Sequence, residues 1–465
     1  MLSLRPVYED EGEKRMNRTI LFRSTIVAAL GGLLFGFDTA VISGAEKSLI
    51  AIFGLSNLWY GFTVASALIG TIVGSITVGR PSDVFGRKKT LMMMGVFYFV
   101  SAVGSALAWN WYWFLIFRFI GGIAVGGASV VSPTYIAEIS PARLRGRLVA
   151  VTQFNIVFGI LLAFLSNYII TTMNLGTVEW RWMFGVEAFP AAAFFFLLFA
   201  NPNSPRWLVA IKKVDQAREV LSRLGTDTAT VEQELEAIQK SLDLEHHSLA
   251  EPFYCSKYSK PIMLAVLIAM FNQLSGINAI LYYAPRIFEK AGAATESAMF
   301  QSVIIGFTNL LFTMLALAII DHFGRKRLML IGSLGYIVSL AAAAVAFFFY
   351  GDNFTPVGGK IVLVALIVFI ASHAFGQGAV IWVFISEIFP NRVRARGQAL
   401  GSFTHWFMAA LVSWTFKPIA EKLGGGPIFA IYAFMMVLQL LWVIFMMPET
   451  KGVPLEEIQK ELGIE

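Results

Sequence analysis

Twelve long apolar runs constrain the fold of this chain more than any other feature of its sequence. Each is about twenty residues long, the length of a membrane-spanning helix and about twice that of a spanning barrel strand. Inside a bilayer, only helices and closed barrels satisfy every backbone hydrogen-bonding group. We therefore predict an all-α membrane protein. The predicted spans are residues 22–45, 57–79, 89–109, 111–137, 147–172, 181–201, 261–290, 298–320, 327–350, 360–388, 396–417 and 426–447.

The composition agrees with this class. Of the 465 residues, 57% are hydrophobic and only 14% are charged, whereas about a quarter are charged in an ordinary soluble domain. The net charge of +6 is spread over loops and gives no nucleic-acid-binding signature. The single cysteine, Cys255, excludes an internal disulfide. The first twenty residues are polar and mixed in charge, so they are not a cleavable signal peptide.

Basic residues gather in alternate loops, after the second, fourth, eighth and tenth runs. Cytoplasmic loops of membrane proteins carry an excess of Lys and Arg. We therefore expect both termini and these loops on the cytoplasmic side of a cell membrane, such as a bacterial inner or plasma membrane. The basic residues are Arg80, Arg87, Lys88, Lys89, Arg143, Arg145, Arg147, Arg325, Lys326, Arg327, Arg392, Arg394 and Arg396.

Two motifs occur once in each half of the chain. Asp83-Val-Phe-Gly-Arg-Lys-Lys returns as Asp321-His-Phe-Gly-Arg-Lys-Arg, and Ala137-Glu-Ile-Ser-Pro-Ala-Arg-Leu-Arg returns as Ser386-Glu-Ile-Phe-Pro-Asn-Arg-Val-Arg. Similarity at such a long period indicates two copies of one structural unit. Two parallel repeats with a substrate site between them are typical of secondary transporters.

Motifs along nearly the whole chain resemble the sugar porter branch of the major facilitator superfamily. The resemblance implies twelve helices in two six-helix bundles, an intracellular helical domain, and alternating access to a central sugar site. The motifs are Gly79-Arg-Pro-Ser-Asp-Val-Phe-Gly-Arg-Lys-Lys89, Arg118-Phe-Ile-Gly-Gly, Tyr135-Ile-Ala-Glu138, Trp180-Arg-Trp-Met-Phe, Ser204-Pro-Arg-Trp-Leu, Gln273-Leu-Ser-Gly-Ile-Asn278, Trp382 with Glu387, and Pro448-Glu-Thr-Lys-Gly452.

The segment between the halves changes composition sharply. Apolar residues recur there at helical spacing among Glu, Gln and Lys, which predicts short amphipathic helices; the alternative is a flexible linker. A short helix is also predicted over Leu455–Leu462. The expected divisions are an N-terminal cytoplasmic tail (1–21), a six-helix bundle (22–201), an intracellular helical domain (202–260), a second bundle (261–447) and a C-terminal cytoplasmic tail (448–465).

Charged residues repeated at helix ends predict a gate on the cytoplasmic side. Arginine and carboxylate groups form bidentate, charge-assisted pairs. Pairs that form only when this side is closed would favour the outward-open state. The alternative is that the arginines only set the membrane topology. The residues are Asp83, Arg87, Glu138, Arg143 and Arg145, with counterparts Asp321, Arg325, Glu387, Arg392 and Arg394.

Two ionisable residues, Asp38 and Arg118, lie within predicted spans. A charge at membrane depth costs at least about 2.5–3.5 kcal/mol and usually marks a pathway or a proton relay. Each is the obvious partner of the other. Moved away from Arg118, a desolvated Asp38 carboxylate would take up a proton, which would couple proton binding to a conformational change. The resemblance supports this role, since proton symporters of the family have Asp at this position and many facilitators do not. A static structural pair is the alternative.

A sugar needs several hydrogen-bonding groups and apolar surfaces in one cleft. The seventh span, interrupted by Gly276, supplies Asn272, Gln273, Asn278 and Tyr282. The tenth span, loosened by Gly376 and Gly378, supplies Trp382. Amides that bridge helices without a ligand are the alternative. By resemblance, the sugar contacts of the family fall on Phe35, Gln153, Gln273, Asn278, Asn309, Trp382 and Trp406.

The histidines add two open questions. His405 is predicted either to hydrogen-bond a sugar hydroxyl or to be a packing residue. His373 and Gln377 are four residues apart, so we expect them to bond each other. None of the five histidines has the spacing of a metal site, and no glycine motif predicts a nucleotide site.

The sequence therefore predicts a monosaccharide–proton symporter for a hexose or pentose such as glucose or xylose. We expect it to function as a monomer in the lipid bilayer, with the proton as coupling ion and no cofactor. The rival interpretations are a sugar uniporter, a polyol or inositol carrier, and a non-transporting sugar sensor. An enzyme is not expected, because no nucleophile–base constellation stands out.

Overall fold

The computed structural model describes residues 18–141, 144–224, 228–248, 252–351, 353–390, 392–453 and 455–464. These residues form helices and no strand, as predicted. The long segments are α1 (Arg18–Phe53), α2 (Asn57–Thr77), α4 (Arg87–Leu107), α5 (Trp111–Ile139), α6 (Arg145–Thr172), α7 (Glu179–Gly185) with α8 (Ala188–Leu197), α12 (Ser259–Leu274) with α13 (Ile277–Lys290), α14 (Thr295–Phe323), α15 (Arg325–Tyr350), α16 (Pro356–His373) with α17 (Ala379–Ile388), α18 (Arg394–Leu423) and α19 (Gly425–Phe445).

Each predicted span corresponds to one helix or to one interrupted helix. In the described part of the chain, eleven such segments are long and apolar enough to cross a membrane. The predicted span 396–417 lies within α18, which falls outside this set because polar residues such as Thr404 and His405 interrupt its apolar run. Helix α18 packs against α2 and α12, so protein surrounds much of it.

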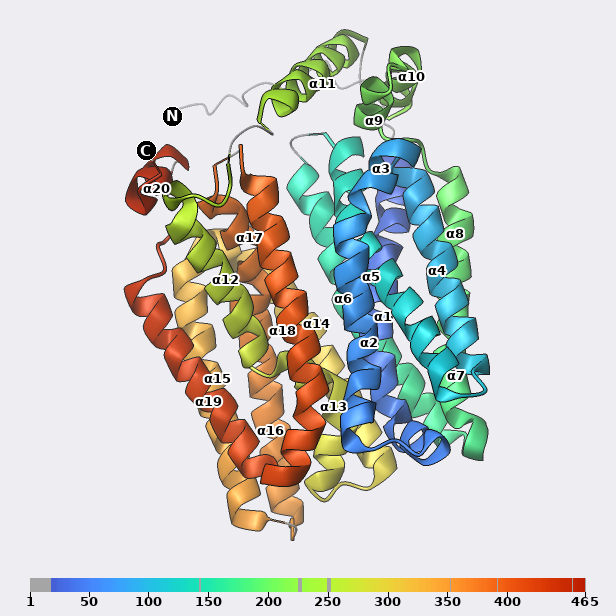
Figure 1. Cartoon of the computed structure of the whole chain (residues 1–465), viewed down its shortest axis with the longest axis vertical. Coiled ribbons are helices and arrows are strands. Elements are labelled where there is room, and N and C mark those ends of the chain that lie inside the picture. Colours follow the sequence, from blue (N-terminus) through green and yellow to red (C-terminus); the bar gives the residue numbers. More distant parts are fainter. Residues whose placement is uncertain are drawn as a thin grey trace, which may run out of the picture.

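The helices form two groups, with α1–α8, including the short α3 (Gly79–Phe85), on one side and α12–α19 on the other (Figure 1). Two short helices, α9 (Pro205–Ala210) and α10 (Val214–Arg223), and the longer α11 (Thr228–Ser248) lie beyond one end of the bundle together with α20 (Leu455–Leu462). The amphipathic helices and the tail helix are thus confirmed. Below, this end is called the α11 end and the opposite one the α13 end.

The two halves contact each other closely at the α13 end. A Cβ atom added to Gly61 of α2 would clash with the carbonyl oxygen of Trp414 in α18. The rings of Phe62 and Trp414 lie 5.3 Å apart, and those of Tyr60 and Tyr283 6.0 Å apart. Toward the α11 end, the helices of the two halves diverge in Figure 1. Glycine at position 61 therefore lets two helix backbones meet where the bundle is closed.

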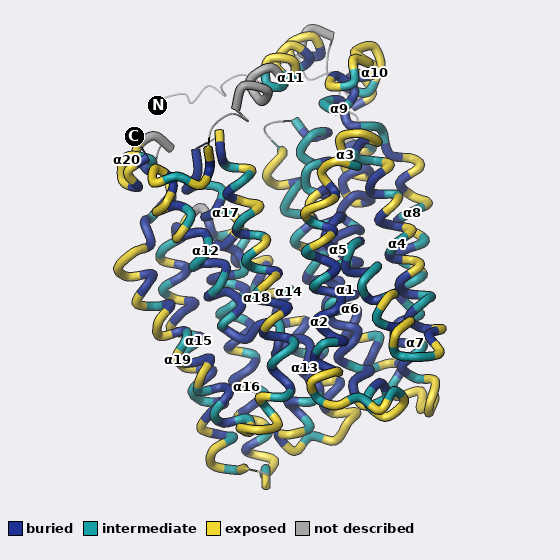
Figure 2. Tube along the Cα trace, in the orientation of Figure 1, coloured by how far each residue is buried: buried dark blue, intermediate teal, exposed yellow. Residues whose placement is uncertain are grey.

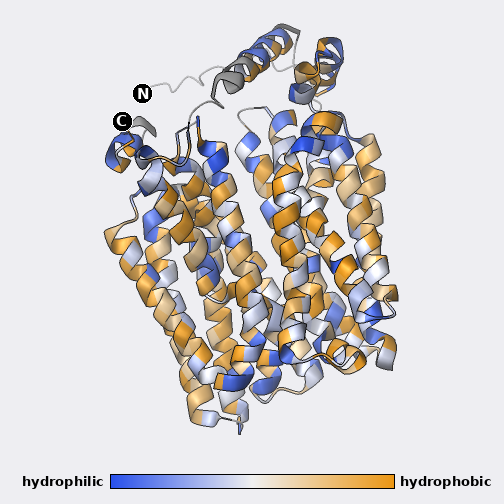
Figure 3. Ribbon diagram, in the orientation of Figure 1, coloured by the Kyte–Doolittle hydropathy of each residue, from blue (hydrophilic) through white to orange (hydrophobic). Residues whose placement is uncertain are grey.

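The burial pattern is that of a protein surrounded by lipid. Buried residues follow the inner faces of both helix groups (Figure 2), and apolar residues dominate the helices over most of their length (Figure 3). Large apolar side chains are also exposed on the outside, with Phe349 at 80%, Phe445 at 79% and Phe189 at 74%. In water such a surface would be an aggregation liability, whereas in a bilayer it faces hydrocarbon.

Two interruptions, both predicted from glycines, shape the helices of the second half. Gly276 adopts a left-handed conformation (φ +85°) between α12 and α13. The segment Ala374–Gly378 is one turn of π-helix between α16 and α17. There, Gly376 and Gly332 of α15 pack backbone to backbone. Such breaks free backbone groups and turn side chains toward the space between the halves, because the regular register of the helix is lost.

We expect Gly276→Ala to destabilise the protein. Alanine in a left-handed conformation costs about 1–2 kcal/mol, and its Cβ would lie 2.6 Å from the Tyr432 ring. Gly54→Ala is the matched control, since Gly54 also has a positive φ of 61° but open space around it. Thermal unfolding of the purified protein in detergent should give the lower melting temperature for Gly276→Ala. Equal melting temperatures would show that the contact with Tyr432 does not matter.

Candidate functional site

A cavity of about 150 Å³ lies between the two halves. A water molecule occupies roughly 30 Å³ in the liquid, so the cavity has room for a small polar molecule. Its lining comes from α1 and α6 on one side and from α12–α14 and α16–α18 on the other. The lining includes all the residues predicted to bind substrate, which are Phe35, Gln153, Asn272, Gln273, Asn278, Tyr282, Asn309, Trp382, His405 and Trp406.

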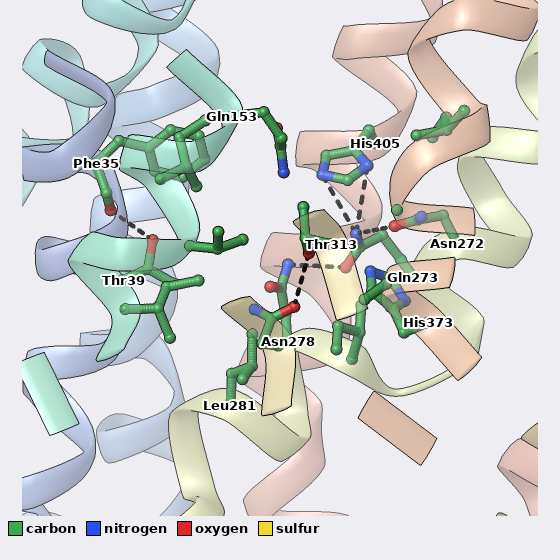
Figure 4. Close-up of a pocket in the computed structure, with 18 of the residues that line it drawn as sticks. Phe35, Thr39, Gln153, Asn272, Gln273, Asn278, Leu281, Thr313, His373 and His405 are labelled. Atoms are coloured by element: carbon green, nitrogen blue, oxygen red, sulfur yellow. Dashed lines mark hydrogen bonds between the residues drawn. The ribbon is translucent and has the colours of Figure 1, made fainter. Parts of the chain in front are cut away.

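An amide network forms one wall of this cavity (Figure 4). Gln273 donates to Asn272 Oδ1 at 2.8 Å and accepts from Asn278 Nδ2 at 2.8 Å. Its Nε2 also lies 3.3 Å from both ring nitrogens of His405. The interruption at Gly276 brings Asn278 back toward Gln273. The wall therefore offers donors and acceptors whose positions are fixed by one another.

Gln153 comes from the opposite half. In Figure 4 its side chain points toward the amide wall across the cavity. Hydrogen-bonding groups thus face each other from α6 and from α12–α13. A ligand held by both would link the two halves.

Aromatic rings supply the apolar surface of the cavity. Phe35 of α1 and Trp406 of α18 are 5.4 Å apart, so this contact bridges the halves. Trp382 packs 5.2 Å from His405, and His405 stands edge-on to Trp406 at 4.8 Å. Rings beside fixed amides suit a ligand that has both C–H and O–H groups, such as a sugar.

The predicted bond between His373 and Gln377 is wrong. His373 Nδ1 instead lies 2.6 Å from the hydroxyl of Tyr336 in α15. Gln377 donates to Gln439 of α19, which donates to Ser333 at 2.8 Å. The π-turn at Ala374–Gly378 explains the difference, because it changes the four-residue register on which the prediction relied.

Two polar side chains of the cavity lining were missed by the sequence analysis. Thr39 donates to the Phe35 carbonyl at 2.9 Å, and Thr313 donates to Asn309 Oδ1 at 3.4 Å. Each threonine follows a predicted sugar contact by four residues and therefore lies on the same helix face. That spacing was a usable signal.

A buried ion pair lies within the first half, as predicted. Arg118 of α5 donates from Nη1 to Asp38 Oδ1 and from Nη2 to the Asp38 carbonyl at 3.4 Å. Only 1% of Arg118 and 3% of Asp38 is exposed. The guanidinium also lies 5.5 Å from the centre of the Phe184 ring. The pair thus joins α1 to α5 in a low-dielectric environment.

A third buried ionisable residue, Glu187, was missed. It is 2% exposed, lies between α7 and α8, and interacts electrostatically with both Asp38 and Arg118. Its position within the predicted span 181–201 was a signal, because an ionisable residue at membrane depth marks a functional site. Two buried carboxyl groups therefore share the electrostatic environment of one guanidinium.

The repeated motifs form matching ion pairs at the α11 end. Arg87 pairs with Glu138 at 3.0 Å and with Asp83 at 3.0 Å. Arg325 binds Glu387 through two bonds of 2.8 and 3.1 Å. Each pair joins elements of one half only. Neither pair therefore depends on a contact with the other half, and the prediction that the pairs form only when the cytoplasmic side is closed stays a prediction.

The remaining gate residues have individual placements. Arg145 donates to the Ala137 carbonyl at 3.0 Å, and Arg394 to the Phe389 carbonyl at 3.4 Å. Arg392 is exposed. Arg143 and the side chain of Asp321 lie outside the described residues.

Two hydroxyl groups complete these pairs and were also missed. Ser204 donates to Glu138 at 2.5 Å, and Thr450 donates to Glu387 at 2.5 Å. The two residues lie in the Ser-Pro-Arg-Trp and Pro-Glu-Thr-Lys-Gly motifs, at corresponding places after the two bundles. The structural repeat therefore extends past the helices.

Comparison with known proteins identifies the family. A family model described as "Sugar (and other) transporter" matches residues 24–462. The chain belongs to the sugar porter family of the major facilitator superfamily.

Relatives within the sugar porter family match over almost their full length. The D-xylose-proton symporter of Escherichia coli strain K12 is 39% identical, over 95% of this chain and 96% of the relative. The galactose-proton symporter of the same strain is 35% identical, over 96% of each. The solved inward-open conformation of the E. coli xylose transporter has a TM-score of 0.84 and 38% identity, over 95% of this chain and 99% of that one.

We expect Arg118→Met to destabilise the protein strongly. It leaves Asp38 and Glu187 buried without a cation, and breaking a buried pair by removing one partner typically costs about 3–5 kcal/mol. The double variant Arg118→Met/Asp38→Asn should recover much of the loss, because one carboxylate is then neutral. Thermal unfolding in detergent at neutral pH measures both. Wild-type stability of the single variant would contradict the electrostatic role of this pair.

Proposed function

We propose that this protein is a monosaccharide–proton symporter, specific for a hexose or pentose, that works by alternating access. The proposal rests on how the central cavity and the buried ionisable residues are arranged. A cavity lined by amides and aromatic rings lies between the halves, and a buried cluster of one guanidinium and two carboxylates lies behind it in the first half. The relatives named as proton symporters of xylose and galactose support it.

Sugar binding would use both halves at once. Gln153 and Phe35 come from the first half, and Gln273, Asn278 and Trp406 from the second. A sugar that bonds to both sets stabilises states in which the halves lie close around it. Such differential binding is what allows a ligand to drive a conformational change.

Proton coupling would use Asp38, Arg118 and Glu187. Arg118 can compensate only one of the two carboxylates, and burying an uncompensated charge is costly. The cluster is therefore suited to take up one proton. Helix α1 provides the link to the sugar, since Phe35 and Thr39 line the cavity while Asp38 between them bonds to α5. A movement of α1 on sugar binding would change the Asp38–Arg118 contact.

We assign the α11 end to the cytoplasm from the positive-inside rule. Arg87, Lys88, Arg325 and Lys326 all lie at that end. The likeness to an inward-open structure, together with the close contacts at the α13 end, supports an inward-facing state. We retain a gating role for the charged motifs, in which the pairs within each half shape the surfaces that meet on closure.

Transport measurements decide between symport and its rivals. Reconstituted vesicles with an inward proton gradient should accumulate labelled glucose, galactose, xylose or fructose above equilibrium, and an uncoupler should abolish the accumulation. Asp38→Asn should still exchange sugar across the membrane but should not accumulate it, because the titratable group is lost.

Each alternative has its own outcome. Equilibration without accumulation by the wild type would indicate a uniporter. Accumulation by Asp38→Asn would remove Asp38 from the coupling mechanism. If none of the four sugars entered, polyols would be tested as substrates next. If these did not enter either, the protein would be a non-transporting sugar sensor.

Gln273→Ala should weaken sugar binding about tenfold or more, since it removes a direct hydrogen bond and releases Asn278. Gln301→Ala is the matched control, because Gln301 lies on α14 at the α13 end and outside the cavity lining. Calorimetry on the purified protein measures both affinities. Unchanged affinity of Gln273→Ala would place the sugar elsewhere.

A further inference from the structure

A second buried ion pair lies at the α13 end, far from the proton cluster. Glu46 of α1 binds Lys417 of α18, and the two side chains are 5% and 7% exposed. The Lys417 ammonium also lies 4.7 Å from the centre of the Tyr60 ring of α2. Lys417 belongs to the second half, whereas Glu46 and Tyr60 belong to the first. This pair therefore bridges the two halves, unlike the ion pairs of the repeated motifs.

A second bridge lies beside it. Lys47 of α1 binds Glu289 of α13 at 2.5 Å and donates to Thr295 at 3.0 Å. Arg286 connects the two bridges, because it lies 4.0 Å from Glu46 and 3.3 Å from Glu289. Positive and negative groups thus alternate along a chain of ion pairs that crosses between the halves three times.

We propose that Glu46 and Lys417 form a charge lock that holds the outer end of the transport pathway shut and separates each time the pathway opens outward. The proposal rests on the proposed function in one respect, namely that the α13 end faces outward and opens during the cycle. For the α13 end to open, Gly61 would have to separate from α18 and Tyr60 from α13.

The buried position makes the lock reversible. Taking two charges out of water carries a large desolvation cost that their attraction only partly repays. Opening the α13 end would let water reach both groups, so hydration would replace the lost attraction. A cavity of about 380 Å³, lined by Glu46, Lys417 and Arg286, adjoins the pair. It provides room for these side chains to move apart.

Neutralising one partner should therefore favour the open state. In the closed state, the remaining charge would be buried without its partner, whereas in the open state water would surround it. The same reasoning predicts that Lys417→Arg keeps the outer end closed, because the positive charge at this position is retained.

Accessibility of an introduced cysteine tests the lock. The parent protein carries Cys255→Ser, which removes the native thiol, and Leu281→Cys, which places a thiol in the central cavity. A membrane-impermeant maleimide added outside intact cells reaches this thiol only through the α13 end. Glu46→Gln and Lys417→Met should each raise the labelling rate at least about tenfold, as the outward-open population grows.

Two further variants act as controls. Lys422→Met removes an exposed lysine of the same helix and should leave the labelling rate unchanged. Lys417→Arg should stay within about threefold of the parent, because it keeps the positive charge and the attraction to Glu46. Labelling in detergent-permeabilised cells confirms that the thiol is present and reactive in each variant.

The lock is overturned if both neutralised variants label within about twofold of the parent, which is no meaningful population shift. Should one of these variants fail to fold, the other decides: fast labelling supports the lock, and labelling within about twofold of the parent overturns it. The assay measures neither sugar accumulation nor proton coupling. A protein that failed to accumulate sugar would refute the proposed symport and leave this comparison intact.

Discussion

Lipid cannot solvate a charge, so each charged group inside the bundle has to be compensated by the protein itself. This constraint explains where the helices of the first half meet. The ion pair between Asp38 and Arg118 joins α1 to α5. Glu187, at the break between α7 and α8, interacts electrostatically with both of these residues. At the α13 end, Glu46 finds its cation on the other half. Charge pairs thus hold each half together and also join the halves where the bundle is closed.

Much of this architecture could be predicted from the sequence, because the responsible signals are local. Apolar run length gave the spans, and glycines at 276, 376 and 378 marked the helix breaks that the structure contains. The repeated motifs located Arg87–Glu138 and Arg325–Glu387, since each motif places an arginine and a carboxylate at neighbouring helix ends. The cavity lining followed from the same breaks together with the family resemblance.

The features that could not be predicted depend on how each helix is rotated about its own axis and on which surfaces of the two halves meet. Lys417 is the last residue of a predicted span and resembles an ordinary interfacial anchor. Only the packing of α18 against α2 and the ion pair with Glu46 of α1 show that it is buried. Glu187 carried a signal, but its partners depend on the break between α7 and α8. The partner of His373 is set by a π-turn, a change of one residue in register that no apolar periodicity reveals.

Helix α1 connects the central cavity, the buried Asp38–Arg118 pair and the Glu46–Lys417 pair. Its Phe35 and Thr39 face the cavity, its Asp38 holds the arginine of α5, and its Glu46 and Lys47 reach the second half about 12 Å farther along the helix axis. A helix moves largely as a rigid element, so a shift that loosens Glu46 from Lys417 also changes the surroundings of Asp38. Outward opening, proton uptake and sugar contact would then be linked by one element rather than by a relay of side chains.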